Sequence, residues 1–154
     1  MVYNKWGTLD EAKELSPSIQ KMLGSMLGVT KPAPVQEPKL AASRATEGDL
    51  AALGRIVGEA FVSTAVGHRR PRARGKSYLD LLDWRMGEEI SAPDVVVTPE
   101  TEEQILEILQ YCSAEGIAVV PFGGGTSVVG GINPVQGEGH RAVISVDLAR
   151  FDAL

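Results

Sequence analysis

Apolar runs and one amphipathic stretch alternate along the carboxyl-terminal third of the chain. Val95-Val96-Val97 predicts a short buried strand, because three β-branched residues follow directly after a proline and an aspartate. Thr101 and Gln104 have the spacing of a capping box and predict the start of a helix. Gly116 occupies the place of the glycine that often ends a helix. Between them, apolar side chains recur at i, i+3, i+4 and i+7: Ile105, Ile108, Leu109 and Cys112.

Two further apolar runs, Ile117–Val120 and Ala142–Val146, predict a second and a third strand. The strand, helix and strand between Val95 and Val120 form a βαβ unit. We therefore expect the first two strands to be parallel and the crossover between them to be right-handed. The predicted fold class is α+β, with an α/β-type βαβ unit in its carboxyl-terminal part.

Helical periodicity dominates the middle of the chain. Thr46, with Asp49 three residues on, predicts the N-cap of one helix. A second helix is predicted from Ser77 to Met86, with Leu79, Leu82 and Met86 on one face. The apolar stripe of the first helix consists of Leu50, Leu53, Val57, Ala60 and Phe61.

The amino-terminal part predicts a short helix from Ser18 to Leu27 and then a proline-rich stretch. Three prolines between Lys31 and Leu40 favour an extended linker or arm over packed structure. We therefore divide the chain into a helical segment with a proline-rich linker (1–40), a helical region (41–91) and the βαβ segment (92–154).

Composition places the chain among ordinary globular proteins. The 154 residues are 44% hydrophobic and 23% charged, with a net charge of −5 that argues against non-specific binding of nucleic acid. The single cysteine, Cys112, excludes an internal disulfide and favours a reducing compartment. Its helical position predicts a buried core residue. There is no apolar run near the roughly 18 residues of a membrane span, and Met1–Val29 lacks the apolar core of a secretory signal. We expect a cytoplasmic protein.

A glycine-rich segment separates the second and third strands. The consecutive glycines lack Cβ atoms, so a ligand can approach the backbone closely and successive N–H groups can form an anion-binding nest. Two hydroxyl donors follow, and together these groups suit a pyrophosphate. The alternative is a tight connection between strands, but the position directly after a βαβ strand favours phosphate binding. The candidate binding residues are Pro121, Phe122, Gly123, Gly124, Gly125, Thr126 and Ser127.

Two familiar phosphate motifs are excluded. A G-x-G-x-x-G pattern starting at Gly123 requires glycine at the position of Val128, so a Rossmann nicotinamide site is not predicted. Gly75-Lys76-Ser77 matches the end of a Walker A loop, but the first glycine of that motif is replaced by Arg70. His68 and His140 have no partners at metal-ligand spacing, so no metal site is predicted.

These motifs carry a family resemblance. The loop 121–127, preceded by Pro93–Val97 and the 101–116 helix, resembles the first FAD-binding subdomain of PCMH-type flavoproteins, the vanillyl-alcohol oxidase family. The segment Arg74–Leu82 is similar to the one that introduces this domain in alkyldihydroxyacetonephosphate synthase and its bacterial relatives, and Lys5-Trp6-Gly7 loosely matches their Trp-Gly start. The resemblance implies an FAD whose pyrophosphate is held by backbone N–H groups of Gly123–Ser127.

The resemblance also implies how the cofactor is attached. Covalently flavinylated relatives have a histidine in this loop, whereas Thr126 stands at that place here, so the resemblance implies non-covalent FAD. The fold would be a helical amino-terminal region followed by the first subdomain of a PCMH-type FAD-binding domain. The chain ends just after the third strand, so we expect an amino-terminal fragment that is inactive alone, with no catalytic residue of its own. A truncated apolar face would favour self-association.

The resemblance leaves three functions open. The first is alkyldihydroxyacetonephosphate synthase chemistry, in which a fatty alcohol replaces the acyl group of acyl-dihydroxyacetone phosphate, a lipid-like substrate. The second is oxidation of a small 2-hydroxyacid such as glycolate or D-lactate. The third is a free-standing nucleotide-binding module without flavin chemistry. The segment Arg74–Leu82 favours the first.

The run His68–Lys76 contains four arginines and one lysine. Such a run is most often a solvated loop. The alternatives are a phosphate grip, which the resemblance favours for Arg74 and Lys76, and RNA binding, for which stacking aromatics are absent from the run.

Overall fold

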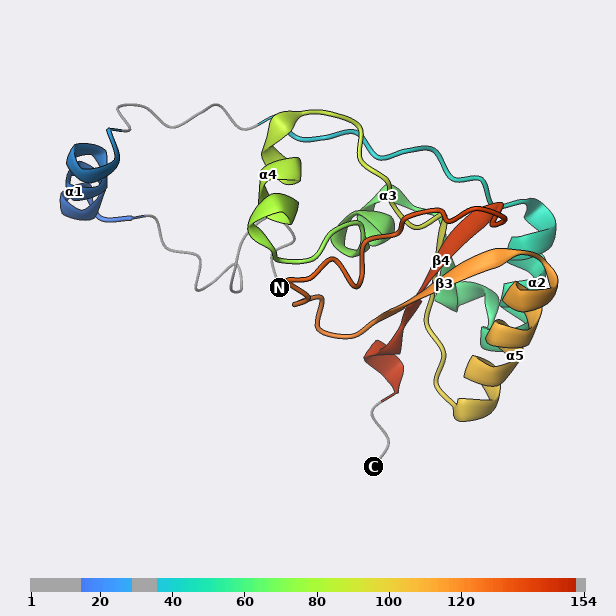
Figure 1. The fold of residues 1–154 in the computed structure, drawn as a ribbon. Helices are drawn as coiled ribbons and strands as arrows, with labels where there is room; N and C mark the ends of the chain where they lie inside the picture. Colours follow the sequence, from blue (N-terminus) through green and yellow to red (C-terminus); the bar gives the residue numbers. More distant parts are fainter. Residues whose placement is uncertain (1–14, 29–35, 152–154) are drawn as a thin grey trace.

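The computed structural model describes residues 15–28 and 36–151, which form a mixed α/β fold (Figure 1). Lys5-Trp6-Gly7 and the stretch Lys31–Val35 lie outside the described residues. The helices are α1 (Pro17–Leu27), α2 (Glu47–Val57), α3 (Val66–Arg69), α4 (Tyr78–Met86) and α5 (Glu102–Ala114), and the 3₁₀ helices are η1 (Glu59–Phe61), η2 (Arg70–Arg72) and η3 (Leu148–Arg150). The strands are β1 (Val62–Ser63), β2 (Val95–Val97), β3 (Ile117–Phe122) and β4 (Ala142–Asp147).

The four strands form one sheet in the order β1-β2-β4-β3. β2 and β3 each pair in parallel with β4, whereas β1 pairs antiparallel with β2. The first two strands of the predicted βαβ unit are therefore parallel, as expected, and β4 lies between them. The predicted α+β class is confirmed, and β3 forms one edge of the sheet.

One face of the sheet packs against α2 and α5, which lie side by side in Figure 1. Cys112 of α5 is 1% exposed in this core, as its helical position predicts, and burial raises the pKa of its thiol to about 11. Burial of each large aliphatic side chain stabilises the fold by about 1.5–3 kcal/mol. The other buried members are Leu53, Val57, Val95, Val97, Ile108, Ile117, Ala142, Ile144 and Val146.

The start of α2 is confirmed and its predicted end is wrong. Thr46 Oγ1 accepts a hydrogen bond from the Asp49 N–H (3.2 Å), and the Asp49 carboxylate accepts one from the Thr46 N–H (2.8 Å). Gly58 follows with φ of 91°, a backbone conformation that stops the helix after Val57. Ala60 and Phe61 consequently lie outside α2 and do not extend its apolar stripe.

The start of α5 differs from prediction in one hydrogen bond. Thr101 Oγ1 accepts from the Gln104 N–H (3.3 Å), as the capping pattern predicts. The Gln104 side chain accepts from the Glu100 N–H (2.7 Å), one residue earlier than a capping box requires. Gly116, with φ of 62°, follows the end of the helix as predicted.

The side chains of β4 on its other face are also buried, and Arg72 of the segment 66–76 pairs with one of them, Asp147. Arg69 is 4% exposed there: its Nε donates to the Pro93 carbonyl and its Nη2 to the Ala41 carbonyl, each at 2.6 Å. Arg44 pairs with the buried carboxylate of Asp94 at 2.9 Å. The interpretation of His68–Lys76 as a solvated loop is therefore wrong, because its arginines bind carbonyls and carboxylates of the fold.

The described end of the proline-rich stretch is extended and packed. Gln36 and Leu40 form isolated parallel bridges with Met86 and Ile90, and Pro38 is fully buried. The extended conformation is confirmed for these residues, but the prediction of a linker or arm instead of packed structure is wrong here, because they pack on a second small core. That core consists of Ala73, Trp84, Ile90 and Ala92.

α1 confirms the short helix predicted from Ser18 to Leu27, and the Ser16 side chain caps it. It buries none of its residues, and Met22 and Met26 are 51% and 73% exposed. Among the helices that the structure describes, none is long and apolar enough to cross a membrane.

Candidate functional site

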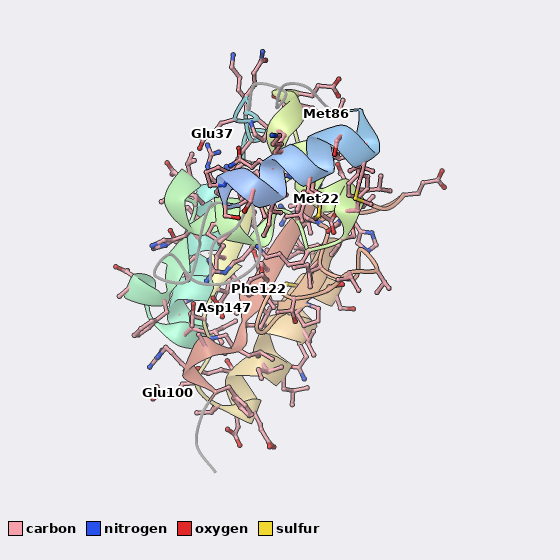
Figure 2. All side chains as sticks on the ribbon, turned by 90° about the vertical axis from the view of Figure 1, so that its left-hand side faces the viewer. Met22, Glu37, Met86, Glu100, Phe122 and Asp147 are labelled. Carbon is pink, nitrogen blue, oxygen red and sulfur yellow. The ribbon has the colours of Figure 1, made fainter. Side chains whose placement is uncertain are left out.

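The glycine-rich loop begins where β3 ends. Phe122, the last residue of β3, is the register partner of Asp147, the last residue of β4, and Figure 2 shows the two side by side. The carboxyl ends of parallel strands are the usual place for ligands in α/β folds, because loops there converge on one edge. Gly123–Ser127 therefore lie at the end of the sheet where ligands usually bind in such folds.

The loop presents backbone donors that the fold does not use. Among the described residues, no acceptor takes a hydrogen bond from the N–H groups of Gly123, Gly124, Gly125 or Thr126. A Cβ added at Gly123 would have no atom within 4 Å, and one at Gly124 would meet only the side chain of Thr126. Four successive open donors without side-chain cover form a surface that suits an anion.

Contacts among the candidate residues fix the conformation of the loop. Gly125 has φ of 66°, and a Cβ there would stand 2.8 Å from the Phe122 ring, so both conformation and space require glycine. Pro121 lies within β3, opposite Val146, and is part of the strand rather than of the loop. The Ser127 hydroxyl accepts a hydrogen bond from the Gly131 N–H at 3.1 Å, which closes the far side of the loop.

A second segment, 74–77, braces the loop. The Lys76 N–H donates to the Ser127 carbonyl at 2.6 Å. Gly75 packs so closely against this carbonyl that a Cβ would stand 2.3 Å from its oxygen. Ser77 caps α4, because its hydroxyl accepts from the Asp80 N–H (3.1 Å) and the Asp80 carboxylate accepts from the Ser77 N–H (3.0 Å). This confirms the predicted helix and fixes the segment that carries the brace.

Asn133 joins both segments. Its Oδ1 accepts from the Gly75 N–H at 3.1 Å, and its Nδ2 donates to Asp80 Oδ1 at 2.8 Å. Asp80 is 3% exposed, and both of its carboxylate oxygens accept hydrogen bonds, Oδ1 from Asn133 and Oδ2 from the Ser77 N–H. The sequence analysis did not identify Asn133, because only the tertiary contact between residues 75–80 and 127–133 gives it a role. It also missed the capping role of Asp80, although the spacing from Ser77 to Asp80 is that of a capping box. The sequence analysis noted the Gly75-Lys76-Ser77 tripeptide of this segment only for its match to the end of a Walker A loop.

Two cations proposed for a phosphate grip have other partners. Arg74 donates to Asp83 (2.7 Å) and to the Ala73 and Ser91 carbonyls (2.8 and 3.0 Å), which places its guanidinium in the fold. Lys76 is only 4% exposed, and burial lowers the pKa of its amine.

A third cation lies at the site itself. The Arg72 guanidinium forms an ion pair with Asp147 and stands over the Phe122 ring, 5.0 Å from its centroid. Asp147 also caps η3, since its Oδ1 accepts from the Ala149 N–H at 2.9 Å. Arg72 thus links the ends of β3 and β4 at the base of the loop.

The segment that contains this site matches a known domain family. Residues 93–154 match the family described as FAD binding domain, and this segment is therefore an FAD-binding one. Half of the chain is similar to alkyldihydroxyacetonephosphate synthase: it is 41% identical to the Trypanosoma brucei brucei protein over 77 residues, which are 50% of this chain and 13% of that protein. A solved structure of alkyldihydroxyacetonephosphate synthase matches the whole chain with a TM-score of 0.83 at 22% identity and shares its fold.

Dehydrogenases of hydroxyacids also match. The Bos taurus protein named D-2-hydroxyglutarate dehydrogenase, mitochondrial, is 31% identical over 133 residues, which are 86% of this chain and 22% of that protein. The chain covers 13% of the trypanosome synthase and 33% of the solved one, so it spans a minor part of each.

The residues present fit the pyrophosphate of FAD. Its charged oxygens need several hydrogen-bond donors at close range, and the loop offers the open N–H groups of residues 123–126. The absence of a side chain at Gly123 and Gly124 leaves room for phosphate against the backbone.

Proposed function

We propose that this chain is the amino-terminal FAD-binding part of a flavoenzyme of the alkyldihydroxyacetonephosphate synthase kind, with residues 92–154 as the first FAD-binding subdomain. The intact enzyme would exchange the acyl group of acyl-dihydroxyacetone phosphate for a fatty alcohol. The trypanosome synthase supports this choice, because its 41% identity extends over 77 residues, more than the segment 93–154 alone could supply.

The observation that carries the proposal is the row of open N–H groups from Gly123 to Thr126. These groups would hold the pyrophosphate, Phe122 would support the loop from below, and the Lys76–Ser127 hydrogen bond would keep the loop in place. Bound FAD supplies the isoalloxazine ring on which flavoenzyme chemistry depends. None of the described residues is assigned to acid or base catalysis.

Attachment of the cofactor would be non-covalent. Thr126 occupies the loop position at which covalently flavinylated proteins of this type have a histidine. A threonine hydroxyl can donate a hydrogen bond to a phosphate oxygen, but it offers no imidazole nitrogen for a bond to the flavin.

The binding test is a titration of the ¹⁵N-labelled chain with FAD, ADP and riboflavin, followed through amide chemical shifts. FAD and ADP should move the amide signals of residues 123–126, whereas riboflavin, which lacks phosphate, should not. Gly123→Asp should abolish the response, because a carboxylate would repel the phosphates. Gly67→Asp is the matched control: it adds the same charge at another glycine with no atom within 4 Å of the added Cβ. Unmoved loop amides at millimolar FAD would refute the proposed cofactor site.

The reaction is tested on the intact gene product. Conversion of acyl-dihydroxyacetone phosphate and a labelled fatty alcohol to labelled alkyl-dihydroxyacetone phosphate, with release of the fatty acid, would support the synthase. Reduction of a dye by a D-2-hydroxyacid in its place would favour the second candidate, a hydroxyacid dehydrogenase, for which the 31% identity with the Bos taurus protein over 86% of this chain is the supporting observation.

We also propose that the chain self-associates and that it is cytoplasmic. The sequence analysis expected association through a truncated apolar face. The support offered by the described residues is instead a group of exposed apolar side chains that line a hollow of about 430 Å³ beside the loop. Tyr78, Leu79 and Val129 are 75%, 69% and 88% exposed there. Light scattering after gel filtration should give a mass above 16.4 kDa, and fractionation of cells should recover the protein with the cytosol. A monomer at high concentration would contradict association.

A further inference from the structure

Arg72 differs from its neighbours in how its guanidinium is bound. In Arg69 and Arg74 the Nε and at least one terminal nitrogen donate to carbonyls or carboxylates of the fold. In Arg72 one terminal nitrogen donates to the His68 carbonyl (2.8 Å) and the other to Asp147, while Nε is buried and has no partner among the described residues. Arg72 therefore retains one donor that the fold does not satisfy.

The surroundings of this guanidinium point toward the loop. Its plane stands over Phe122, the residue directly before Gly123, and the backbone of Gly125 packs against the same ring. An arginine over an aromatic ring is held in place by cation–π attraction. Its positive charge is thus held beside Phe122, the residue that leads into the open N–H groups.

We propose that Arg72 supplies the positive charge that the pyrophosphate of FAD meets beside the glycine loop, and that Phe122 and Asp147 hold this charge in position. The inference rests on the proposed cofactor site and deepens it. Loop N–H groups contribute partial charges, whereas the guanidinium is a cation. The Asp147 carboxylate offsets part of its field, and the remainder strengthens phosphate binding. The partly buried position of Arg72, with 19% of its side chain exposed, limits screening of this charge by salt.

The test compares Arg72→Met with Arg72→Lys in the same amide-shift titration with FAD and ADP. Arg72→Met should weaken binding of both by about tenfold, a charge-assisted contact being lost. Arg72→Lys should stay within about threefold of the unmodified chain, because lysine restores the charge without the planar fork. Adenosine, which has no phosphate, should bind all variants equally.

Arg70→Met is the matched control, since it removes the same charge two residues away, where Arg70 pairs with the exposed Glu37 at 3.5 Å. It should leave the affinity for FAD unchanged. If Arg72→Lys loses as much affinity as Arg72→Met, or if Arg70→Met loses as much, the charge of Arg72 is not the cause and the inference fails. Equal binding of FAD by all variants would overturn the inference while leaving the proposed cofactor site intact. Absence of binding by the unmodified chain would overturn both.

Discussion

Replacement of Gly75 by alanine tests the contact between the segment 74–77 and the glycine loop. The added Cβ would stand 2.3 Å from the Ser127 carbonyl oxygen, 3.0 Å from Asp80 Oδ2 and 3.2 Å from the Ser127 carbonyl carbon. Two of these neighbours are backbone atoms and cannot rotate away. The segment 74–77 and the loop must therefore move apart.

The size of the effect follows from the hydrogen bond next to this contact. Relief of the clash needs a separation of about 1 Å, which would lengthen the Lys76 N–H to Ser127 carbonyl bond from 2.6 Å to a distance at which no hydrogen bond remains. A buried donor left without a partner costs about 1–3 kcal/mol. We expect Gly75→Ala to lower the free energy of unfolding by about 2–3 kcal/mol and to weaken binding of FAD, because the loop loses its support.

The assay is urea unfolding followed by circular dichroism, together with the FAD titration. Gly67→Ala provides the control: its Cβ would have no atom within 4 Å, and alanine favours the helix α3 in which it lies. This variant should be as stable as the unmodified chain or slightly more stable. If Gly75→Ala matches it to within about 0.5 kcal/mol, the packing of residue 75 against the loop has been misjudged.

Three further predictions concern other parts of the chain. Arg141 binds the Asp49 carboxylate through two hydrogen bonds of 2.6 and 2.9 Å and holds the pKa of that carboxyl well below its ordinary value. Asp49→Asn should thus lower the free energy of unfolding at pH 7 by about 1–3 kcal/mol. The difference from the unmodified chain should shrink as the pH falls below about 4, since a carboxyl with a lowered pKa stabilises the fold above its unfolded pKa and loses this effect on protonation; an unchanged difference at pH 2.5 would contradict the role of the ion pair. Cys112, with its thiol pKa raised to about 11 by burial, should resist a disulfide reagent at pH 8 in the folded chain. In urea, the extent of its reaction should rise with the same midpoint as unfolding. Rapid reaction of the folded chain would disprove its place in the core. Acid precipitation of the FAD-loaded intact protein should leave all flavin in solution, whereas flavin retained by the precipitate would show a covalent bond.

Local patterns of residue type determined most of the secondary structure. The caps at Thr46, Ser77 and Thr101 are short-range hydrogen bonds within one turn of helix, so the sequence alone predicts where these helices begin. The burial of Val95–Val97 follows in the same way from a run of β-branched residues. The error at the end of α2 was also local, because Gly58 interrupts a stripe that continues in sequence but not in space.

The glycine loop was identified from the sequence for a similar reason. Successive glycines leave the backbone without side-chain cover, and the preceding strand places them at a sheet edge. The family resemblance then supplied FAD, and the match of residues 93–154 to the FAD binding domain agrees with it.

Only the tertiary structure decided which partners the charged residues have. Arg69, Arg72 and Arg74 are close in the sequence and alike in type, yet they bind a backbone carbonyl of Pro93, the carboxylate of Asp147 and the carboxylate of Asp83. Asp147 lies 75 residues from Arg72 along the chain. Such partners depend on the order of strands in the sheet, β1-β2-β4-β3, which places the end of β4 beside the end of β3. The spacing of residues along the chain does not predict this strand order, because a contact between distant segments is fixed by packing and not by the local backbone.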